Sequence, residues 1–294
     1  MTETTFFRLL QANDKGEALA NAVAALRAGT PSADVHVVDP QQFRQIPGSP
    51  FAYWVSERVR RLFTELDPFE TKSRQARRGA STGNDFRRVR AWWEIAPDRV
   101  GRQTGWVALS KGGAYSPYYG DVHLLVAWDD ARQTFLDFYG RPGRMIEKPE
   151  ALEYFFRPGL TWPRRTTSGI SVRILPPGCI FSDKGPSAFA KPEALPTLLG
   201  LMNSGIFEEL VALQLGAADK AARSYEVGVV QRTPVPDLSG PEGERLGELA
   251  LDCFNFKRDL ETANETSQAF VLPAIVQERR DTLAASITAW GERV

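Results

Sequence analysis

The spacing of hydrophobic residues predicts helices toward both ends of the chain. In the first of them, Leu19, Val23 and Leu26 recur three or four residues apart and Gly29 ends the run. The segment after Pro50 is amphipathic, with apolar residues on one face and arginines largely on the other. The predicted helices cover residues 17–28, 50–66, 195–215 with a break at 203–205, 242–260, and the segment beyond Pro273.

Residues 69–196 have a different pattern, in which short apolar or alternating runs are separated by glycine, proline and serine. Such a pattern is typical of an antiparallel, loop-rich β region. The predicted strands cover residues 34–38, 105–109, 122–128, 133–138, 170–175, 179–182 and 227–230. The expected fold class is therefore α+β. We divide the chain into an N-terminal helical and linker segment, a β-rich domain and a C-terminal helical segment, at residues 1–50, 51–236 and 237–294.

The composition is that of an ordinary globular protein. Of the 294 residues, 43% are hydrophobic and 24% charged, which argues against disorder. No apolar run approaches the roughly 20 residues that span a bilayer, and the N-terminus lacks the pattern of a secretory signal. Cys179 and Cys253 are too few for a disulfide framework or a four-thiolate zinc site. We therefore expect a cytoplasmic protein that has no membrane partner.

Basic residues are concentrated in the β-rich region, although the net charge of the chain is zero. Residues 71–111 contain ten Lys or Arg and three acids, and residues 154–182 contain four Arg and no acid. The compensating excess of acid follows Pro236. A basic face on a neutral protein indicates a polyanion partner. Surface arginines that pair locally would give the same composition, so composition alone leaves both interpretations open.

The motifs do not predict a catalytic centre. P-loop, dinucleotide-binding and nucleophile-elbow motifs are absent, and His36 and His123 are isolated from other metal ligands. Asp137, Glu147 and Lys148 resemble the acidic pair and lysine of metal-dependent nucleases, but their spacing is wrong. We expect no catalytic residue and no metal ligand in this chain, and we leave open whether it is part of an enzyme.

Three polar, glycine-containing loops rich in basic residues lie in the β-rich region, at residues 77–88, 110–120 and 159–169. Glycines let backbone N–H groups approach phosphates, and Ser, Thr and Asn side chains add hydrogen bonds. Arginines supply charge and bidentate contacts to bases. Three such loops in one β-rich region favour nucleic acid as the polyanion.

At these loops the sequence resembles the target-recognition region of adenine-specific DNA methyltransferases of the type IIG restriction-modification kind. The likeness is greatest to the PglX methyltransferases of BREX phage-exclusion systems. The matching motifs occur in the family's order along nearly the whole chain, at residues 37–39, 46–56, 79–85, 87–88, 92–94, 111–113, 118–120, 159–162, 198–204, 233–236, 257–260, 264–267 and 272–273. The motifs at 198–204 and 233–236 are similar to the closing helix and strand of a recognition domain, an ending that restriction specificity subunits share.

The resemblance implies that residues 51–236 form a recognition domain for double-stranded DNA. The S-adenosylmethionine motif and the Asn-Pro-Pro-Tyr tetrapeptide of the family's catalytic half do not occur in this sequence. Because base flipping and methylation need that pocket, the chain by itself is expected to bind DNA without methylating it. S-adenosylmethionine is expected only in a catalytic partner or a missing domain. The implied protein partners are a methyltransferase catalytic domain or other defence-system proteins.

The resemblance also implies that the loops at 79–88, 111–113 and 159–169 face DNA. Our own division of roles assigns phosphate contacts to Lys72, Arg74, Arg77, Arg78 and Lys111. It assigns base-edge contacts to Asn84, Arg87, Arg88, Arg164, Arg165 and Thr166. The predicted DNA-binding set is completed by Ser81, Thr82, Gly112 and Gly113.

Three alternatives stay open at this point. The helices predicted at 50–66 and 242–260 could dock to a methyltransferase core or another defence protein, and the arginine loops would then be ordinary surface. A nuclease that uses Asp137 and Glu147, or a Cys179–His123 nucleophile pair, would make the chain an enzyme in its own right. A non-functional gene fragment that folds but does not bind DNA is the third alternative.

Overall fold

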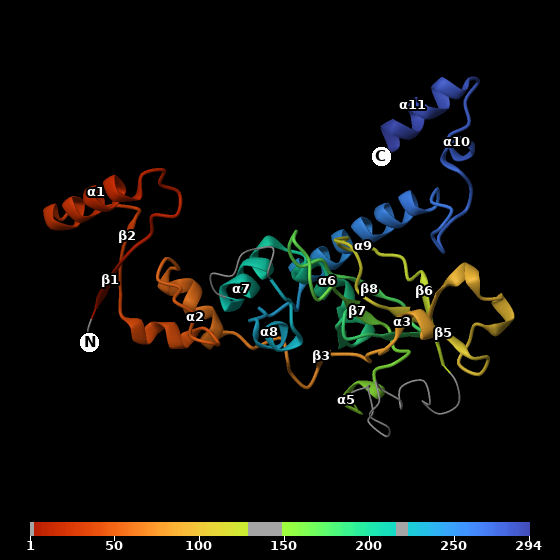
Figure 1. Ribbon diagram of the computed structural model, residues 1–294, viewed down its shortest axis with the longest axis horizontal. Helices are drawn as coiled ribbons and strands as arrows, with labels where there is room; N and C mark the ends of the chain where they lie inside the picture. The colour runs from red at the N-terminus through yellow and green to blue at the C-terminus, as the bar shows by residue number, and fades with distance from the viewer. Residues whose placement is uncertain (1–2, 129–148, 216–222) are drawn as a thin grey trace.

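The computed structural model describes residues 3–128, 149–215 and 223–294 of the chain (Figure 1). The fold is α+β, as the sequence predicts. The strands are β1 Thr4–Phe7, β2 Val35–Val38, β3 Arg74–Arg77, β4 Val89–Ala91, β5 Trp106–Ser110, β6 Leu124–Ala127, β7 Gly159–Thr161, β8 Arg173–Leu175, β9 Cys179–Phe181 and β10 Ser187–Ala190. The helices are α1 Lys15–Ala28, α2 Glu57–Glu65, α3 Asp85–Arg88, α5 Pro149–Leu152, α6 Leu195–Met202, α7 Gly205–Leu215, α8 Val227–Arg232, α9 Pro241–Glu261, α10 Ala274–Gln277 and α11 Leu283–Arg293. The described residues also form the 3-10 helices η1 Pro40–Gln45, η2 Trp92–Glu94, η3 Pro97–Arg99 and η5 Pro192–Ala194.

The N-terminal part is a small lobe in which β1 pairs antiparallel with β2 and α1 connects them. Asp14 caps α1 by accepting hydrogen bonds from the backbone N–H groups of Gly16 and Glu17. Gly29 ends the helix in the left-handed conformation, at φ 66°, which glycine adopts without steric cost. The predictions of a helix ending at Gly29 and of a strand near residues 35–38 are therefore confirmed.

Two four-stranded sheets form the central part, in the orders β3-β10-β7-β8 and β4-β6-β5-β9. All pairs in them are antiparallel except β5 and β9, which run parallel, so the expectation of a purely antiparallel region is wrong at this pair. The strands predicted near 105–109, 122–128, 170–175 and 179–182 are present as β5, β6, β8 and β9. The strand predicted at 133–138 lies outside the described residues.

The larger hydrophobic core lies between the β3-β10-β7-β8 sheet and helices α6, α7 and α8. Trp162 and Tyr225 are its largest fully buried side chains. Helix α9 then packs closely on α6, because Gly200 faces Leu246 with no room for a Cβ atom. The second core is formed by β5, β6 and β9 together with Tyr154, Phe155 and Phe189.

Two local predictions are wrong for reasons of packing. Residues 227–230 form helix α8 rather than a strand, because their apolar side chains pack into the core as one helical face. Helix α2 begins at Glu57 after the Ser56 cap, not at Pro50. The aromatic residues before it turn back onto the N-terminal lobe instead, where Tyr53 stacks on Phe6 at 4.7 Å.

Figure 1 shows the N-terminal lobe at one end of the molecule and α10 and α11 at the other, with the two central sheets between them. Residues 67–69 and 233–235 lie side by side, joined by backbone hydrogen bonds from Phe69 to Thr233 and from Val235 to Asp67. No single helix in the described ranges is both long and apolar enough to cross a membrane. The segments Pro192–Met202 and Gly205–Leu215 pass that test only as a pair bent by 71°.

Candidate nucleic-acid interface

The three predicted loops converge on a fourth segment, residues 182–185, which connects β9 to β10. The backbone N–H of Ala80 donates to Phe181 and that of Asp183 donates back to Ala80, at 3.0 and 2.9 Å. Two further 2.9 Å hydrogen bonds tie Ser182 to Ser110 and Arg164 to Lys184. Loops that are far apart in the sequence are therefore joined by main-chain bonds into one surface.

Four cations gather where these segments meet, and we call them the basic cluster: Arg78, Arg164, Lys184 and Lys111. Asp183, whose side chain is only 11% exposed, lies within ion-pair distance of the first three, at 3.3, 3.7 and 3.4 Å. Lys111 pairs instead with Asp85. Asp183 is nearly buried and Asp85 is exposed, and together they pair with all four cations. The N–H donors that these ion pairs leave unused are the ones that a polyanion would contact.

Asp85 anchors the first loop to the second. It accepts hydrogen bonds from Thr82 and from the Lys111 ammonium. Partial burial opposes ionisation of Asp85, but these hydrogen bonds and the lysine charge prevail and lower the pKa of its carboxyl. The lowered pKa means that this pair stabilises the fold above the unfolded-state pKa of about 3.9 and loses that contribution as the pH falls through the folded-state pKa. At neutral pH the anchor is fully charged.

Glycine permits the close approach of the second loop to residues 182–185. A Cβ atom on Gly112 would lie 2.5 Å from the carbonyl oxygen of Lys184, and the residue has a φ of 84°. A side chain there would be strained both by contact and by conformation. Gly113, at φ 106°, follows directly, and both glycines line a pocket.

Further predicted residues lie on the same segments as the basic cluster. Arg87 and Arg165 are exposed, and neither forms an ion pair with a described residue. Asn84 caps the short helix α3 by accepting from the N–H of Arg87, and Arg88 is half-buried on that helix. Ser81 lies half-buried in the same loop. The Thr166 hydroxyl donates to the carbonyl of Gly169 at 2.6 Å, which closes the third loop on itself.

The remaining predicted residues are not brought into the basic cluster. Arg77 pairs with Glu70 at 2.6 Å and lies over the ring of Tyr154. Arg74 donates to the main-chain oxygens of Phe69 and Pro68. Lys72 is exposed in the turn before β3. These three cations therefore lie along β3 and its preceding turn.

Residues Asp183, Lys184 and Gly185 were missed by sequence reasoning, although they form the centre of this surface. A charged Asp-Lys-Gly turn between two apolar strands is an ordinary hairpin signal, and its spacing says nothing about distant arginines. Glu226 was missed as well, and its carboxylate lies 3.6 Å from Arg164 Nε.

The described residues bear on one of the enzyme alternatives, the use of Cys179 as a nucleophile. Cys179 is buried in β9, and burial raises the pKa of its thiol to about 12, so it is not an activated thiolate at neutral pH. Asp137 and Glu147 lie outside the described ranges. Elsewhere in those ranges no three His, Cys, Asp or Glu side chains gather in a way that could hold a metal ion.

We expect the two cysteines to differ in reactivity. Cys253 is exposed on α9, whereas the raised pKa and burial of Cys179 keep it protonated and shielded. Titration of the native protein with Ellman's reagent at pH 8 should therefore modify one thiol, and titration in denaturant should modify both. Fast reaction of both thiols in the native protein would contradict the burial of β9.

The fold and the basic cluster define this chain as an α+β protein with a positively charged, loop-built surface. It is similar to the adenine-specific methyltransferase PglX of Lacticaseibacillus casei (strain Zhang), with 26% identity over 266 residues that cover 84% of this chain and 21% of that protein. It is also similar to the adenine-specific methyltransferase BrxX of Escherichia coli O9:H4 (strain HS), with 26% identity over 170 residues that cover 55% of this chain and 13% of that protein.

No family model matches the chain. The chain spans about a fifth of the length of PglX and about an eighth of that of BrxX. The predicted resemblance to adenine-specific methyltransferases named PglX is thus confirmed, and it is confined to a small part of those proteins.

Proposed function

We propose that this chain is the double-stranded-DNA target-recognition part of an adenine-specific methyltransferase that acts in phage defence. The observation that carries the proposal is the convergence of three separate loops on one basic cluster, built by main-chain hydrogen bonds. The phosphates of a DNA backbone form a polyanion that such a surface can bind. Arginines on rigid loops can also form hydrogen bonds with the edges of bases. The similarity to PglX and BrxX supplies the methyltransferase context.

In this proposal the chain binds DNA and does not transfer a methyl group. S-adenosylmethionine would be bound by a catalytic domain, whether on a partner or elsewhere in the same protein. Docking to that domain or to another defence protein would use apolar side chains that α9 exposes, namely Leu249, Leu251 and Phe256. These residues are not part of the basic cluster, so docking is compatible with DNA binding. The protein would act in the cytoplasm, where its DNA is.

The test is a pair of substitutions, one in the basic cluster and one at the carboxylate that pairs with it, that should act in opposite directions. Arg78→Ala removes a cation whose side chain is 42% exposed, and it should weaken binding to all duplex sequences by about threefold to tenfold. It should also reduce the slope of log affinity against log salt concentration by about one. Asp183→Asn removes the carboxylate that competes with phosphate for three cations, so it should tighten binding and steepen the salt slope.

Fluorescence anisotropy with labelled random duplexes, across a salt series, measures both quantities. Arg61→Ala is the matched control, because Arg61 is an exposed arginine on α2 that pairs within its own helix. Its DNA affinity should equal that of the wild type. If the unmodified chain binds no duplex at low salt, or if all three variants bind alike, the proposal is wrong.

A further inference from the structure

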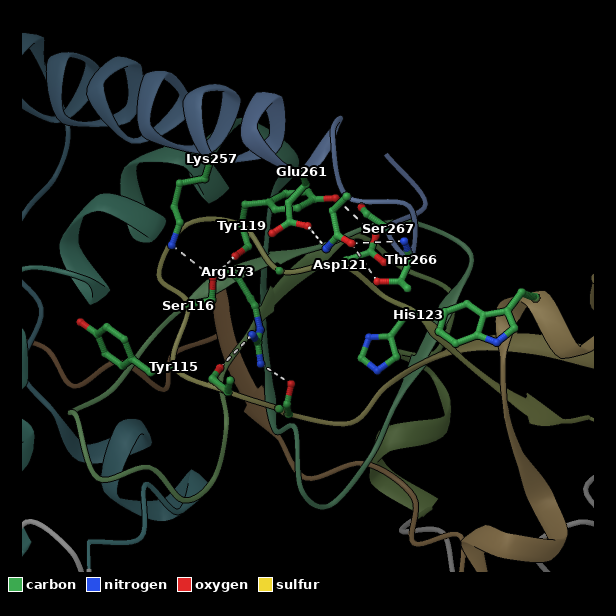
Figure 2. Close-up of a pocket in the computed structure, with 16 residues that line it drawn as sticks. Tyr115, Ser116, Tyr119, Asp121, His123, Arg173, Lys257, Glu261, Thr266 and Ser267 are labelled. Atoms are coloured by element: carbon green, nitrogen blue, oxygen red, sulfur yellow. Dashed lines mark hydrogen bonds between the residues drawn. The ribbon is translucent and has the colours of Figure 1, made fainter. Parts of the chain in front are cut away.

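A pocket with a volume of about 510 Å³ is lined in part by Gly112 and Gly113 (Figure 2). Its walls come from residues 112–123, from β8, from the end of α9 and from residues 264–267. Figure 2 shows Lys257, Ser116 and Arg173 on one side of the pocket and Asp121, Thr266 and Ser267 on the other. The volume is in the range of pockets that hold small ligands.

The wall formed by β8 carries a buried cation that has no carboxylate partner. Arg173 is only 7% exposed, and it donates hydrogen bonds to the main-chain oxygens of Gly112 and Ala114. It forms no ion pair with any described residue. Burial lowers the pKa of Arg173. A buried cation held only by neutral groups is stabilised further when an anion binds beside it.

A second cation reaches the same wall from helix α9. Lys257 donates to the hydroxyl oxygen of Ser116 at 3.2 Å, and within the described ranges it too lacks an ion pair. Burial and the nearby Arg173 charge lower the pKa of Lys257, and they outweigh the opposing effect of Glu261. One of three ammonium hydrogens is used by Ser116, so two donors are left for a ligand.

The carboxylates of the pocket are engaged by neighbouring amides and a hydroxyl. Asp121 accepts from the backbone N–H of Gln268 at 3.2 Å and from the Tyr119 hydroxyl at 3.3 Å. Glu261 accepts from the side-chain amide of Asn264 at 2.8 Å. Within the described ranges neither acid forms an ion pair with Arg173 or Lys257, and the charge of Glu261 only partly offsets the lowering of the Lys257 pKa.

The glycine turn forms another wall of the same pocket. Its carbonyl oxygens at Gly112 and Ala114 accept hydrogen bonds from the Arg173 guanidinium, which holds that cation at the pocket wall. Two cations in one pocket, neither with an ion-pair partner within the described ranges, are charged donors of the kind with which proteins bind phosphate.

We propose that this pocket binds a phosphoryl group, with Arg173 and Lys257 as its charged ligands. The phosphoryl group belongs either to the backbone of DNA or to a small phosphate ester. The pocket and the basic cluster share the Lys111–Gly113 turn, so a DNA strand that crosses this turn would reach both. The site itself does not depend on the proposed DNA function.

Isothermal titration of the full chain with inorganic phosphate tests the site. We expect saturable binding in the millimolar range or tighter, and Lys257→Gln should weaken it by about tenfold, the value of one charge-assisted hydrogen bond. Glutamine is a good helix former and carries no charge, so helix α9 and the fold should survive, and thermal unfolding checks this. Arg245→Gln, an exposed arginine on the same helix that pairs with Glu248, is the matched control and should bind phosphate like the wild type.

The source of the phosphoryl group is decided by repeating the titration with deoxyadenosine monophosphate and with duplex DNA. Loss of affinity for phosphate and duplex together in Lys257→Gln assigns the pocket to a DNA phosphate. Loss for phosphate and the mononucleotide, with unchanged duplex binding, assigns it to a small ester. Equal phosphate affinity in wild type and Lys257→Gln, or no saturable binding of phosphate or mononucleotide, overturns the proposal. A chain that binds phosphate but no duplex refutes only the proposed DNA function.

Discussion

Replacing Trp162 with alanine is expected to lower the free energy of unfolding by about 3–5 kcal/mol, the usual cost of deleting a buried indole. Trp162 is completely buried where the β3-β10-β7-β8 sheet meets helices α6 to α8. Its indole N–H donates to the main-chain oxygen of Tyr225 at 2.8 Å, so the substitution also leaves that buried oxygen without its donor. Urea unfolding followed by circular dichroism measures the loss.

Trp93→Ala is the matched control for this experiment. Trp93 is 54% exposed and contacts Trp92 edge-on, so its removal should change stability by about 0.5 kcal/mol or less. Equal losses in the two variants would show that Trp162 is not the centre of the core.

Gly79→Ala should destabilise the chain by about 2–3 kcal/mol, because the new methyl group has no space. Its Cβ atom would lie 2.0 Å from the main-chain oxygen of Phe181, an atom of strand β9 that cannot move away alone. The same oxygen accepts from Ala80, so the first loop has to separate from β9 to make room. Because Arg78 reaches Asp183 only while the loop is attached, DNA affinity should fall along with stability.

Gly228→Ala is the natural comparison, since nothing lies within 4 Å of the Cβ position on that glycine of α8. Alanine in a helix is more stable than glycine by up to about 1 kcal/mol, so this variant should unfold at equal or higher urea concentration. Its DNA affinity should be that of the wild type. A Gly79→Ala protein that behaves like Gly228→Ala would contradict the attachment of the loop to β9.

The helices that were predicted well are those whose ends are determined by residues close to them in the sequence. Helix α1 has its cap at Asp14 and its stop at Gly29, and the break between α6 and α7 falls at Asn203 and Ser204. Capping is a local interaction over three or four residues, so periodicity and spacing are enough to find it.

The elements that were missed depend on distant partners. Strands β3, β7 and β10 are three or four residues long, and each exists because another strand lies beside it. The orientation of Arg60 is a similar case. The arginines of this helix were predicted to lie largely on its polar face, yet Arg60 is buried and donates to Gln42 at 2.7 Å, because the N-terminal lobe covers that side. A residue's own neighbours in sequence carry no information about such covering segments.

The sequence by itself determined that the chain is α+β, that its basic residues are concentrated in loops of the β-rich region, and that it resembles adenine-specific methyltransferases. Only the tertiary structure decided that these loops meet at Asp183, that Arg77 pairs with Glu70 instead, and that Arg173 and Lys257 line one pocket. The physical reason is that composition and local spacing fix which charges and turns are present. Which carboxylate neutralises which cation depends on chain segments that come together only when the sheets and helices pack.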